Sequence, residues 1–404
     1  MSILQIPNIP YDDNLIKSIK IISANSKDLQ NNIRVNKTLY MYLTKIKSQI
    51  DGQQIAWDRY KKYTNPYEFI HTSVPGSKLS ISRIKPQSRS FYKMIEIYNS
   101  INFEIFDEKN LNIFYIAEGP GGFIEALIYL RNTQEKVCSG DKHHAISLID
   151  NSDSTIPGWD RSKDFIKKNK NIKIELGVDG TGNIFNPETY KDIYDKYNNT
   201  MDFVTGDGGF NFADDFNKQE QSSSKLILCQ IAYMFAVQKY NGDSVIKFFD
   251  TFTDLSIDLT YLLMLAYKKV TWIKPVTSRY ANSEKYACCK GFRIENRVQL
   301  INTFTEILVN LQENDTIEIA RIFNCSIPYT IITKITECNA IMGQQQIESI
   351  VNTLALIDNI KIDKLDSIKK NNITKCITWC SKYNIPYNKI INTNIFTANT
   401  NVLK

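Results

Sequence analysis

Two lysines stand in apolar surroundings in this sequence, where a charged side chain is costly unless it is paired. Lys247 interrupts the hydrophobic run from Asp243 to Phe249, which is predicted to be a β-strand. Lys93 stands on a predicted helix from Ser88 to Tyr98, among apolar side chains that would partly desolvate its ammonium group. A lysine on a helix is more often a surface residue. Lys247 is therefore the stronger candidate for a chemical role, and Lys93 needs support from other parts of the chain.

A strand, a tight turn and a helix are predicted from Ile113 to Leu130. The apolar run from Ile113 to Ala117 is rich in β-formers and too short for a helix, and helical spacing begins at Phe123. Between them, the glycines of segment 119–122 would let the backbone approach a ligand, and the helix N-terminus would offer free N–H groups to an anion. That anion could be a phosphate or the carboxylate of a bound amino acid. An ordinary turn with no ligand explains this motif about equally well when it is taken alone.

Further apolar runs predict the rest of a doubly wound α/β sheet, in which strands alternate with helices. Ala145 to Ile149 ends at Asp150, which could hold ribose hydroxyls or cap a turn, and Ile172 to Gly177 is another strand. Met201 to Gly206 runs into Asp207, which two glycines follow. Because ligands bind at the carboxyl edge of such sheets, Asp207 is expected to point into the same crevice as the glycine turn.

Composition limits the class of protein. The length of 404 residues fits one large α/β domain with smaller additions, and the net charge of +6 is compatible with a polyanionic substrate without requiring one. The eight cysteines and three histidines lack the spacing of a zinc site, so no metal is expected and the cysteines are expected to be reduced. The longest apolar run, Leu259 to Ala266, is too short to span a bilayer, and no membrane partner is expected.

Three segments are predicted along the chain: a helical segment at residues 1–85, the α/β domain at residues 86–298, and a helical accessory segment at residues 299–404. In the first segment, Trp57 to Glu68 mixes aromatic and cationic residues, a combination that suits stacking on bases and pairing with phosphates. A solvated amphipathic helix that ends at Pro66 explains the same stretch, and this stretch alone favours that simpler explanation.

Seven motifs join these observations into one pattern. In their order over residues 60 to 292 they resemble the FtsJ-like ribose 2′-O-methyltransferases, and specifically the cap-specific mRNA (nucleoside-2′-O-)-methyltransferases of eukaryotes and large DNA viruses. Each motif is weak alone, but together they are specific. The motifs are Asn65-Pro-Tyr-Glu68, Ser88-Arg-Ser-Phe-Tyr-Lys93, Gly119-Pro-Gly-Gly-Phe123, Asp179-Gly-Thr-Gly182, Asp207-Gly-Gly-Phe210, Lys247-Phe-Phe-Asp-Thr-Phe252 and Lys274-Pro-Val-Thr-Ser-Arg-Tyr-Ala-Asn-Ser-Glu-Lys-Tyr286.

The resemblance implies a Rossmann-like sheet of about seven strands, the last one reversed, that binds S-adenosyl-L-methionine (SAM). Asn183 is an amide at a position where the family has an acid. The residues that the resemblance implies for catalysis form a tetrad of Lys93, Asp207, Lys247 and Glu284. Those implied to bind SAM are Ser88, Ala117, Glu118, Gly119, Pro120, Gly121, Gly122, Phe123, Asn183, Ile184 and Asp207. Those implied to hold capped RNA are Lys47, Lys61, Asn217, Gln219 and Asn282. The resemblance therefore implies that the segment at residues 1–85 contributes to RNA and cap binding.

The tetrad also makes chemical sense by itself. A ribose 2′-OH is a poor nucleophile, so methyl transfer needs a base and in-line placement of the reacting atoms. Burial in a strand and the neighbouring cation Lys93 both disfavour the charged form of Lys247, which suits Lys247 to act as the general base. Asp207 and Glu284 would hold the net charge of the site near neutral. The sulfonium of SAM supplies the electrophile, so no metal is required.

The expected function is SAM-dependent 2′-O-methylation of capped mRNA, from cap 0 to cap 1, with other capping or transcription enzymes as candidate partners. The expected location is the host cytoplasm or the virion for a viral protein, and the nucleus for a cellular eukaryotic enzyme. Three alternatives stay open. A 2′-O-methyltransferase of ribosomal or transfer RNA would keep the tetrad but lack a cap pocket, against which the loop of Asn217 and Gln219 argues. A non-catalytic RNA-binding or polymerase-accessory module would not need both lysines, and a plain nucleotide-binding Rossmann domain does not explain Lys247.

Overall fold

The structure is a computed structural model of the 404-residue chain. It describes residues 1–23, 33–133, 140–150, 152–153, 155–209, 217, 219–314, 318–359 and 362–388. Phe210, which closes one of the seven motifs, and residues 389–404 of the predicted C-terminal segment lie outside the described residues.

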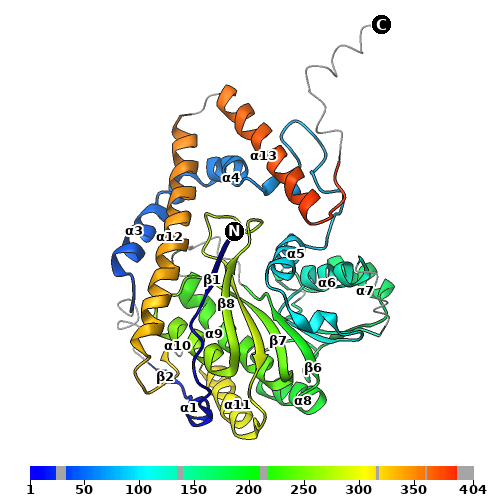
Figure 1. Ribbon diagram of the computed structural model, residues 1–404, viewed down its shortest axis with the longest axis vertical. Coiled ribbons are helices and arrows are strands. Elements are labelled where there is room, and N and C mark those ends of the chain that lie inside the picture. The colour runs from blue at the N-terminus through cyan, green and yellow to red at the C-terminus, as the bar shows by residue number, and fades with distance from the viewer. Residues whose placement is uncertain are drawn as a thin grey trace.

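A mixed sheet of eight strands forms the centre of the described part of the chain (Figure 1). Its order is β1-β8-β9-β7-β6-β3-β4-β5, and the strands from β5 to β7 in this order are parallel. β9 runs antiparallel to both β7 and β8, which confirms the predicted reversal of the last strand of the sheet. The strands are β1 (Ser2–Gln5), β3 (Asn112–Ile116), β4 (Lys142–Ile146), β5 (Ile172–Glu175), β6 (Met201–Gly206), β7 (Gln238–Phe248), β8 (Tyr267–Lys274) and β9 (Lys285–Phe292).

The doubly wound α/β class is confirmed, but the sheet has one strand more than the seven predicted. The additional strand is β1, which pairs antiparallel with β8 so that Ser2 lies opposite Lys274. The N-terminal segment is therefore not wholly helical. Its first residues form a strand that covers the edge of β8. A strand of four residues is too short to give a periodic signal in the sequence.

The parallel strands are buried on both faces, as strands between two helical layers must be. In β3, Phe114 and Ile116 belong to one apolar core, and Ile113 and Tyr115 belong to the other. The first core takes residues from α8 (Pro187–Tyr197), α9 (Gln219–Val237), α10 (Asp254–Ala266) and α11 (Val298–Glu313). The second core takes residues from α5 (Ser90–Ser100), α6 (Gly122–Thr133) and α13 (Ile362–Lys382).

Helices from the two ends of the chain pack against one another. α3 (Lys37–Lys47) and α4 (Gln54–Thr64) lie beside the 30-residue helix α12 (Tyr329–Asp358) (Figure 1). β2 (Ile22–Ser23) pairs with β10 (Ile319–Arg321) in a second, two-stranded sheet. The terminal segments are thus joined to each other, and the segment boundaries at residues 85 and 298 stay predictions. A third apolar core fills the helical junction and consists of Leu43, Ile46, Ile50, Trp57, Phe252, Ile347, Ile350 and Leu354.

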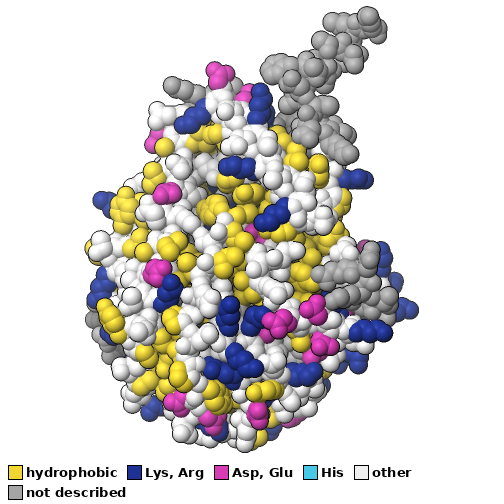
Figure 2. All heavy atoms as spheres, viewed as in Figure 1, with side chains coloured by type: hydrophobic (Ala, Val, Ile, Leu, Met, Phe, Trp, Pro, Cys, Tyr) yellow, Lys and Arg dark blue, Asp and Glu magenta, His cyan; other side chains and the backbone are white. Residues whose placement is uncertain are grey.

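The face of the molecule in Figure 2 carries side chains of both charges. On the face in Figure 2, cationic and acidic side chains are interspersed, in keeping with the small net charge of +6. No helix in the described ranges is long and apolar enough to cross a bilayer. Within the same ranges, no group of three or more His, Cys, Asp or Glu residues is arranged to hold a metal ion.

Candidate active site

Asp207 and Lys247 meet at the carboxyl edge of the sheet. Asp207 directly follows β6, and Lys247 stands near the end of the neighbouring strand β7. The Lys247 Nζ lies 3.1 Å from Asp207 Oδ1 and donates a hydrogen bond of 2.6 Å to the Asp207 carbonyl oxygen. Their side chains are only 11% and 12% exposed. The backbone and the side chain of Asp207 therefore both hold this ammonium group in place.

Lys93 and Glu284 form a second ion pair, between α5 and the segment just before β9. The Lys93 Nζ lies 2.6 Å from Glu284 Oε1, and both residues are buried. Burial by itself would raise the pKa of Glu284, but the charges of Lys93, Lys247 and Arg89 outweigh it and hold that pKa well below its usual range. Glu284 is therefore a carboxylate at physiological pH and provides Lys93 with a charged partner.

Tyr286 connects the two ion pairs, a role that the sequence pattern did not assign to it. Its hydroxyl oxygen lies 2.9 Å from Asp207 Oδ1 and 3.1 Å from Glu284 Oε1, and the residue stands opposite Lys247 in the β7–β9 register. Burial and the two carboxylates raise the pKa of Tyr286 well above its usual range, so its hydroxyl keeps the proton that the carboxylates share. Tyr286 follows Glu284 by two residues, and alternate residues of an extended segment share a face. That spacing is the signal by which the sequence could have shown it.

The glycine turn lies between β3 and α6 and has no room for side chains. A Cβ atom on Gly119 would lie 2.5 Å from the carbonyl oxygen of Gly158, and one on Gly122 would lie 2.2 Å from Ser88 Oγ. Gly121 has a φ of +93°, which strains any residue with a side chain. The turn therefore presents bare backbone with Ser88 beside it, as the close approach of a ligand requires.

The residues that flank the glycine turn include a buried carboxyl group, one oxygen of which has no hydrogen-bond partner among the described residues. Ala117 directly follows β3 and has a left-handed conformation, with a φ of 55°, and Phe123 is fully buried. Glu118 is buried and accepts a hydrogen bond from Thr205, but its Oε2 has no hydrogen-bond partner in the described part of the chain. Burial and the charge of Asp207 raise the pKa of Glu118 well above its usual range. An unpaired carboxyl oxygen beside the turn fits a ligand that brings donor groups, as the amino and hydroxyl groups of SAM do.

The loop that follows β5 lies beside the glycine turn. A Cβ atom on Gly182 would lie 2.2 Å from the carbonyl oxygen of Ser147, and Ser147 Oγ accepts a hydrogen bond of 3.1 Å from the backbone N–H of Gly119. The loop that carries Asn183 and Ile184 therefore adjoins the glycine turn through Ser147. Asn183 Oδ1 accepts a hydrogen bond from the backbone of its own loop, and Ile184 is buried in the core. The glycine turn, Ser88 and the loop of Asn183 thus lie next to one another, and their predicted role in binding SAM stays a prediction.

Three of the five residues predicted to hold capped RNA, Asn217, Gln219 and Asn282, lie in or next to segments that contact one another. The Asn217 Nδ2 donates a hydrogen bond of 3.4 Å to Ser48 Oγ at the end of α3. Gln219 Oε1 accepts a hydrogen bond of 3.0 Å from the hydroxyl of Ser283, the neighbour of Asn282. Asn217 therefore contacts the end of α3, and Gln219 contacts the loop of Asn282 and Glu284.

The other two residues, Lys47 and Lys61, are paired with carboxylates. The Lys47 Nζ lies 3.2 Å from Asp250 Oδ2, and its side chain is only 8% exposed. Lys61 pairs with Asp58 within α4. A phosphate contact by either lysine would require its ammonium group to exchange partners, so their predicted role in RNA binding stays a prediction.

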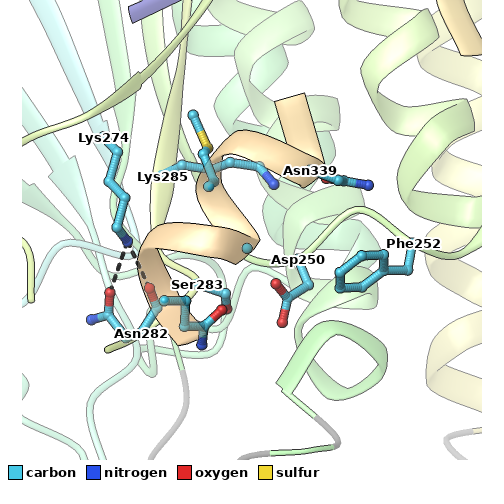
Figure 3. A pocket seen from close by; sticks show the side chains of 10 residues that line it. Asp250, Phe252, Lys274, Asn282, Ser283, Lys285 and Asn339 are labelled. Atoms are coloured by element: carbon cyan, nitrogen blue, oxygen red, sulfur yellow. Dashed lines mark hydrogen bonds between the residues drawn. The ribbon is translucent and has the colours of Figure 1, made fainter. Parts of the chain in front are cut away.

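Lys274, at the end of β8, holds the loop that carries Asn282 and Glu284 (Figure 3). Its Nζ donates hydrogen bonds to the Asn282 carbonyl oxygen at 2.7 Å, to Asn282 Oδ1 at 3.2 Å and to the Glu284 carbonyl oxygen at 2.7 Å. Burial lowers the pKa of Lys274 to about 7, against the attraction of Glu284. Lys274 belongs to the last of the seven motifs, but its type and spacing did not distinguish a structural lysine from a catalytic one.

The N-terminal segment reaches the same loop through Glu68. The Nε and Nη2 atoms of Arg279 donate hydrogen bonds of 3.0 and 2.6 Å to the two carboxylate oxygens of Glu68, a bidentate geometry. The Glu68 side chain is 1% exposed and that of Arg279 is 28% exposed, so the carboxylate is withdrawn from water while the guanidinium keeps partial contact with it. The ion pair joins two of the seven motifs, and no feature of either motif alone predicts it.

The chain is similar to proteins of known class. The model of the FtsJ-like methyltransferase family matches residues 86–292, just over half of the 404 residues. The chain is 29% identical over 383 residues to cap-specific mRNA (nucleoside-2′-O-)-methyltransferase 1 of Dictyostelium discoideum, covering 91% of this chain and 49% of that protein. It is 31% identical over 260 residues to the protein of the same name from Mus musculus, covering 61% of this chain and 29% of that protein. The chain thus spans about half of the length of the first relative and less than a third of the second.

Among solved structures, a ribosomal RNA methyltransferase from Plasmodium falciparum is 22% identical, covering 52% of this chain and all of that one, with a TM-score of 0.35. The family match rests on residues 86–292, which contain the glycine turn and the two ion pairs at the sheet edge. The chain therefore belongs to the FtsJ-like methyltransferase family, and its cofactor is S-adenosyl-L-methionine.

Proposed function

We propose that this protein methylates the ribose 2′-OH of capped mRNA, converting cap 0 to cap 1, with Lys247 as general base. The observation that carries the proposal is the arrangement of the two ion pairs. Lys247 is largely removed from water and held by Asp207, and Tyr286 links Asp207 to the pair of Lys93 and Glu284. Such a site places one lysine Nζ beside two carboxylates and a second lysine, which is a set of groups suited to base-assisted transfer to a hydroxyl.

Each member of the tetrad has a separate task in this proposal. The neutral amine form of Lys247 takes the proton of the 2′-OH at its Nζ, and the ribose oxygen forms the new bond to the methyl carbon. Asp207 orients Lys247 through its carbonyl and carboxylate oxygens. Glu284 and Lys93 fix the other side of the site, and Tyr286 keeps the two carboxylates at a fixed separation. When bound, SAM supplies an activated methyl group on a sulfonium, and the sulfur keeps the electron pair of the broken bond.

The choice of capped mRNA as substrate is supported by the names of the two relatives and by the contacts around Asn282. Asn217, Gln219 and Asn282 belong to one connected set of segments that adjoins Glu284. An RNA end held there would bring its first nucleotide next to the tetrad. Ribosomal and transfer RNA have no cap, so an enzyme of those substrates would not need this set of residues.

The test is methyl transfer from labelled SAM to two RNAs of one sequence, with and without a cap, followed by nucleoside analysis. The proposal predicts a 2′-O-methylated first nucleotide on the capped RNA only. Equal transfer to both RNAs would replace the cap-specific function with a ribosomal or transfer RNA function. No transfer by the folded protein, with SAM bound, would favour a non-catalytic RNA-binding module.

A further inference from the structure

The loop between β8 and β9 carries Asn282 and Glu284, and it rests on the C-terminal helix α12. Gln346 of α12 is 2% exposed, and its Nε2 donates a hydrogen bond of 3.1 Å to the carbonyl oxygen of Ala281. The Ala281 side chain packs against the apolar core shared by α3, α4 and α12. The residue next to Asn282 is therefore held through both its backbone and its side chain.

A small cavity lies between this loop and α12 (Figure 3). It has a volume of about 10 Å³, which is room for about one water molecule. Its lining is largely polar, so a shift of α12 would disturb hydrogen bonds as well as packing. The residues that line it are Asp250, Phe252, Lys274, Asn282, Ser283, Lys285, Asn339, Met342, Gly343 and Gln346.

The same face of α12 also contacts α3 and the segment that follows β7. A Cβ atom on Gly343 would lie 2.9 Å from Leu39 Cδ2, so α12 passes close to α3 at this point. Asn339 donates a hydrogen bond of 2.8 Å to the carbonyl oxygen of Thr251, and Thr251 in turn donates one of 2.6 Å to Asn339 Oδ1. α12 is thus in contact with α3, with the segment that follows β7 and with the loop of Asn282.

We propose that α12 sets the spacing of the capped-RNA site and that Gln346 is a positioning residue for Asn282. This inference rests on the proposed function, because it assigns Asn282 to the recognition of the cap. Gln346 acts through Ala281 and touches neither the reacting atoms nor the cofactor-binding turn. Its loss should therefore weaken capped RNA selectively, while a general loss of fold would weaken every ligand.

The test compares Gln346→Leu with Gln344→Leu, a change of the same kind on an exposed residue of the same helix. Full-length variants are titrated with capped and uncapped RNA of one sequence and with SAM, and their melting temperatures are compared. Loss of one buried hydrogen bond predicts that Gln346→Leu binds capped RNA about fivefold to tenfold more weakly. Binding of uncapped RNA and of SAM should stay within about twofold of the wild type, and Gln344→Leu should match the wild type.

A second variant covers the case in which Gln346→Leu does not fold. Gln346→Asn keeps the amide but shortens its reach, so it should show a smaller, still cap-selective loss. Equal losses on capped and uncapped RNA, or unchanged capped-RNA binding in both variants, would overturn the role of Gln346. If the wild-type protein itself does not distinguish capped from uncapped RNA, the proposed function fails instead of this inference.

Discussion

Replacing Lys247 with arginine separates two explanations of this residue. As a general base, Lys247 must release and accept a proton, which a guanidinium cannot do at working pH. As a simple counter-charge to Asp207, it could be replaced by any cation that reaches the carboxylate. The space is narrow, because a Cβ atom on Gly209 would lie 3.1 Å from the Lys247 Nζ. Ligand affinities must therefore be measured together with the rate.

The variant Lys247→Arg removes the base without removing the positive charge that neutralises Asp207. Lys247→Arg keeps the positive charge beside Asp207, so the electrostatic part of the site is largely preserved. Removal of a positioned base lowers the rate by about 10²-fold to 10⁴-fold, which corresponds to about 2.7 to 5.4 kcal/mol in the activation free energy. Lys247→Arg and Lys247→Ala should therefore both lose at least about 100-fold in rate, while their affinities for SAM and capped RNA change by less than about threefold.

The assay is single-turnover methyl transfer from labelled SAM to capped RNA, across a range of pH and with variants of matched melting temperature. Lys239→Arg is the matched control, since Lys239 lies on the same strand, is 56% exposed and pairs with the buried carboxylate of Asp202. It should keep the wild-type rate. A Lys247→Arg rate above about a tenth of the wild-type value would refute the assignment of Lys247 as the base.

Three further predictions concern the cofactor turn, the substrate loop and pH. Gly119→Ala puts a Cβ atom 2.5 Å from a backbone oxygen, and should weaken SAM binding in calorimetry by at least about tenfold while the circular dichroism of the sheet is kept. A double-mutant cycle of Glu68→Gln and Arg279→Gln, measured by urea unfolding, should give a coupling free energy of about 1–3 kcal/mol, and additive effects would contradict their pairing. Because the pKa of Lys274 is lowered to about 7 in the folded state, the unfolded chain binds the additional proton above that pH. The free energy of unfolding of the wild type should therefore rise relative to that of Lys274→Met between pH 7 and about pH 10, by up to about 1.4 kcal/mol per pH unit. The same pH dependence in both proteins would contradict this prediction.

The sheet and its carboxyl edge could be predicted from the sequence because local patterns determine them. Parallel strands between two helical layers read as short apolar runs, and β3, β6 and β7 gave that signal. Once these strands are adjacent, residues at their ends must meet at one edge of the sheet. Asp207 and Lys247 are brought together in this way. No assumption about distant segments was needed for this part of the site.

Residues that work through distant contacts could not be predicted in the same way. Lys274 stands at the end of a strand like Lys247 does, but it bonds backbone and amide oxygens of the following loop instead of a carboxylate. Sequence alone does not say which acceptors a buried lysine meets. The pairing of Glu68 with Arg279 joins positions 211 residues apart, and either residue alone reads as an ordinary surface charge.

The helix α12 shows the same limit on a larger scale. It belongs to the helical segment predicted at residues 299–404, but a helical pattern does not say what its buried face packs against. In the structure the face meets α3 and α4, and Gln346 meets the loop of Asn282. The family match ends at residue 292, although residues on both sides of the matched range hold the loop that carries Glu284. The matched range therefore contains the residues proposed for the chemistry, while the shape of the site where we propose that RNA binds depends on contacts made by both ends of the chain.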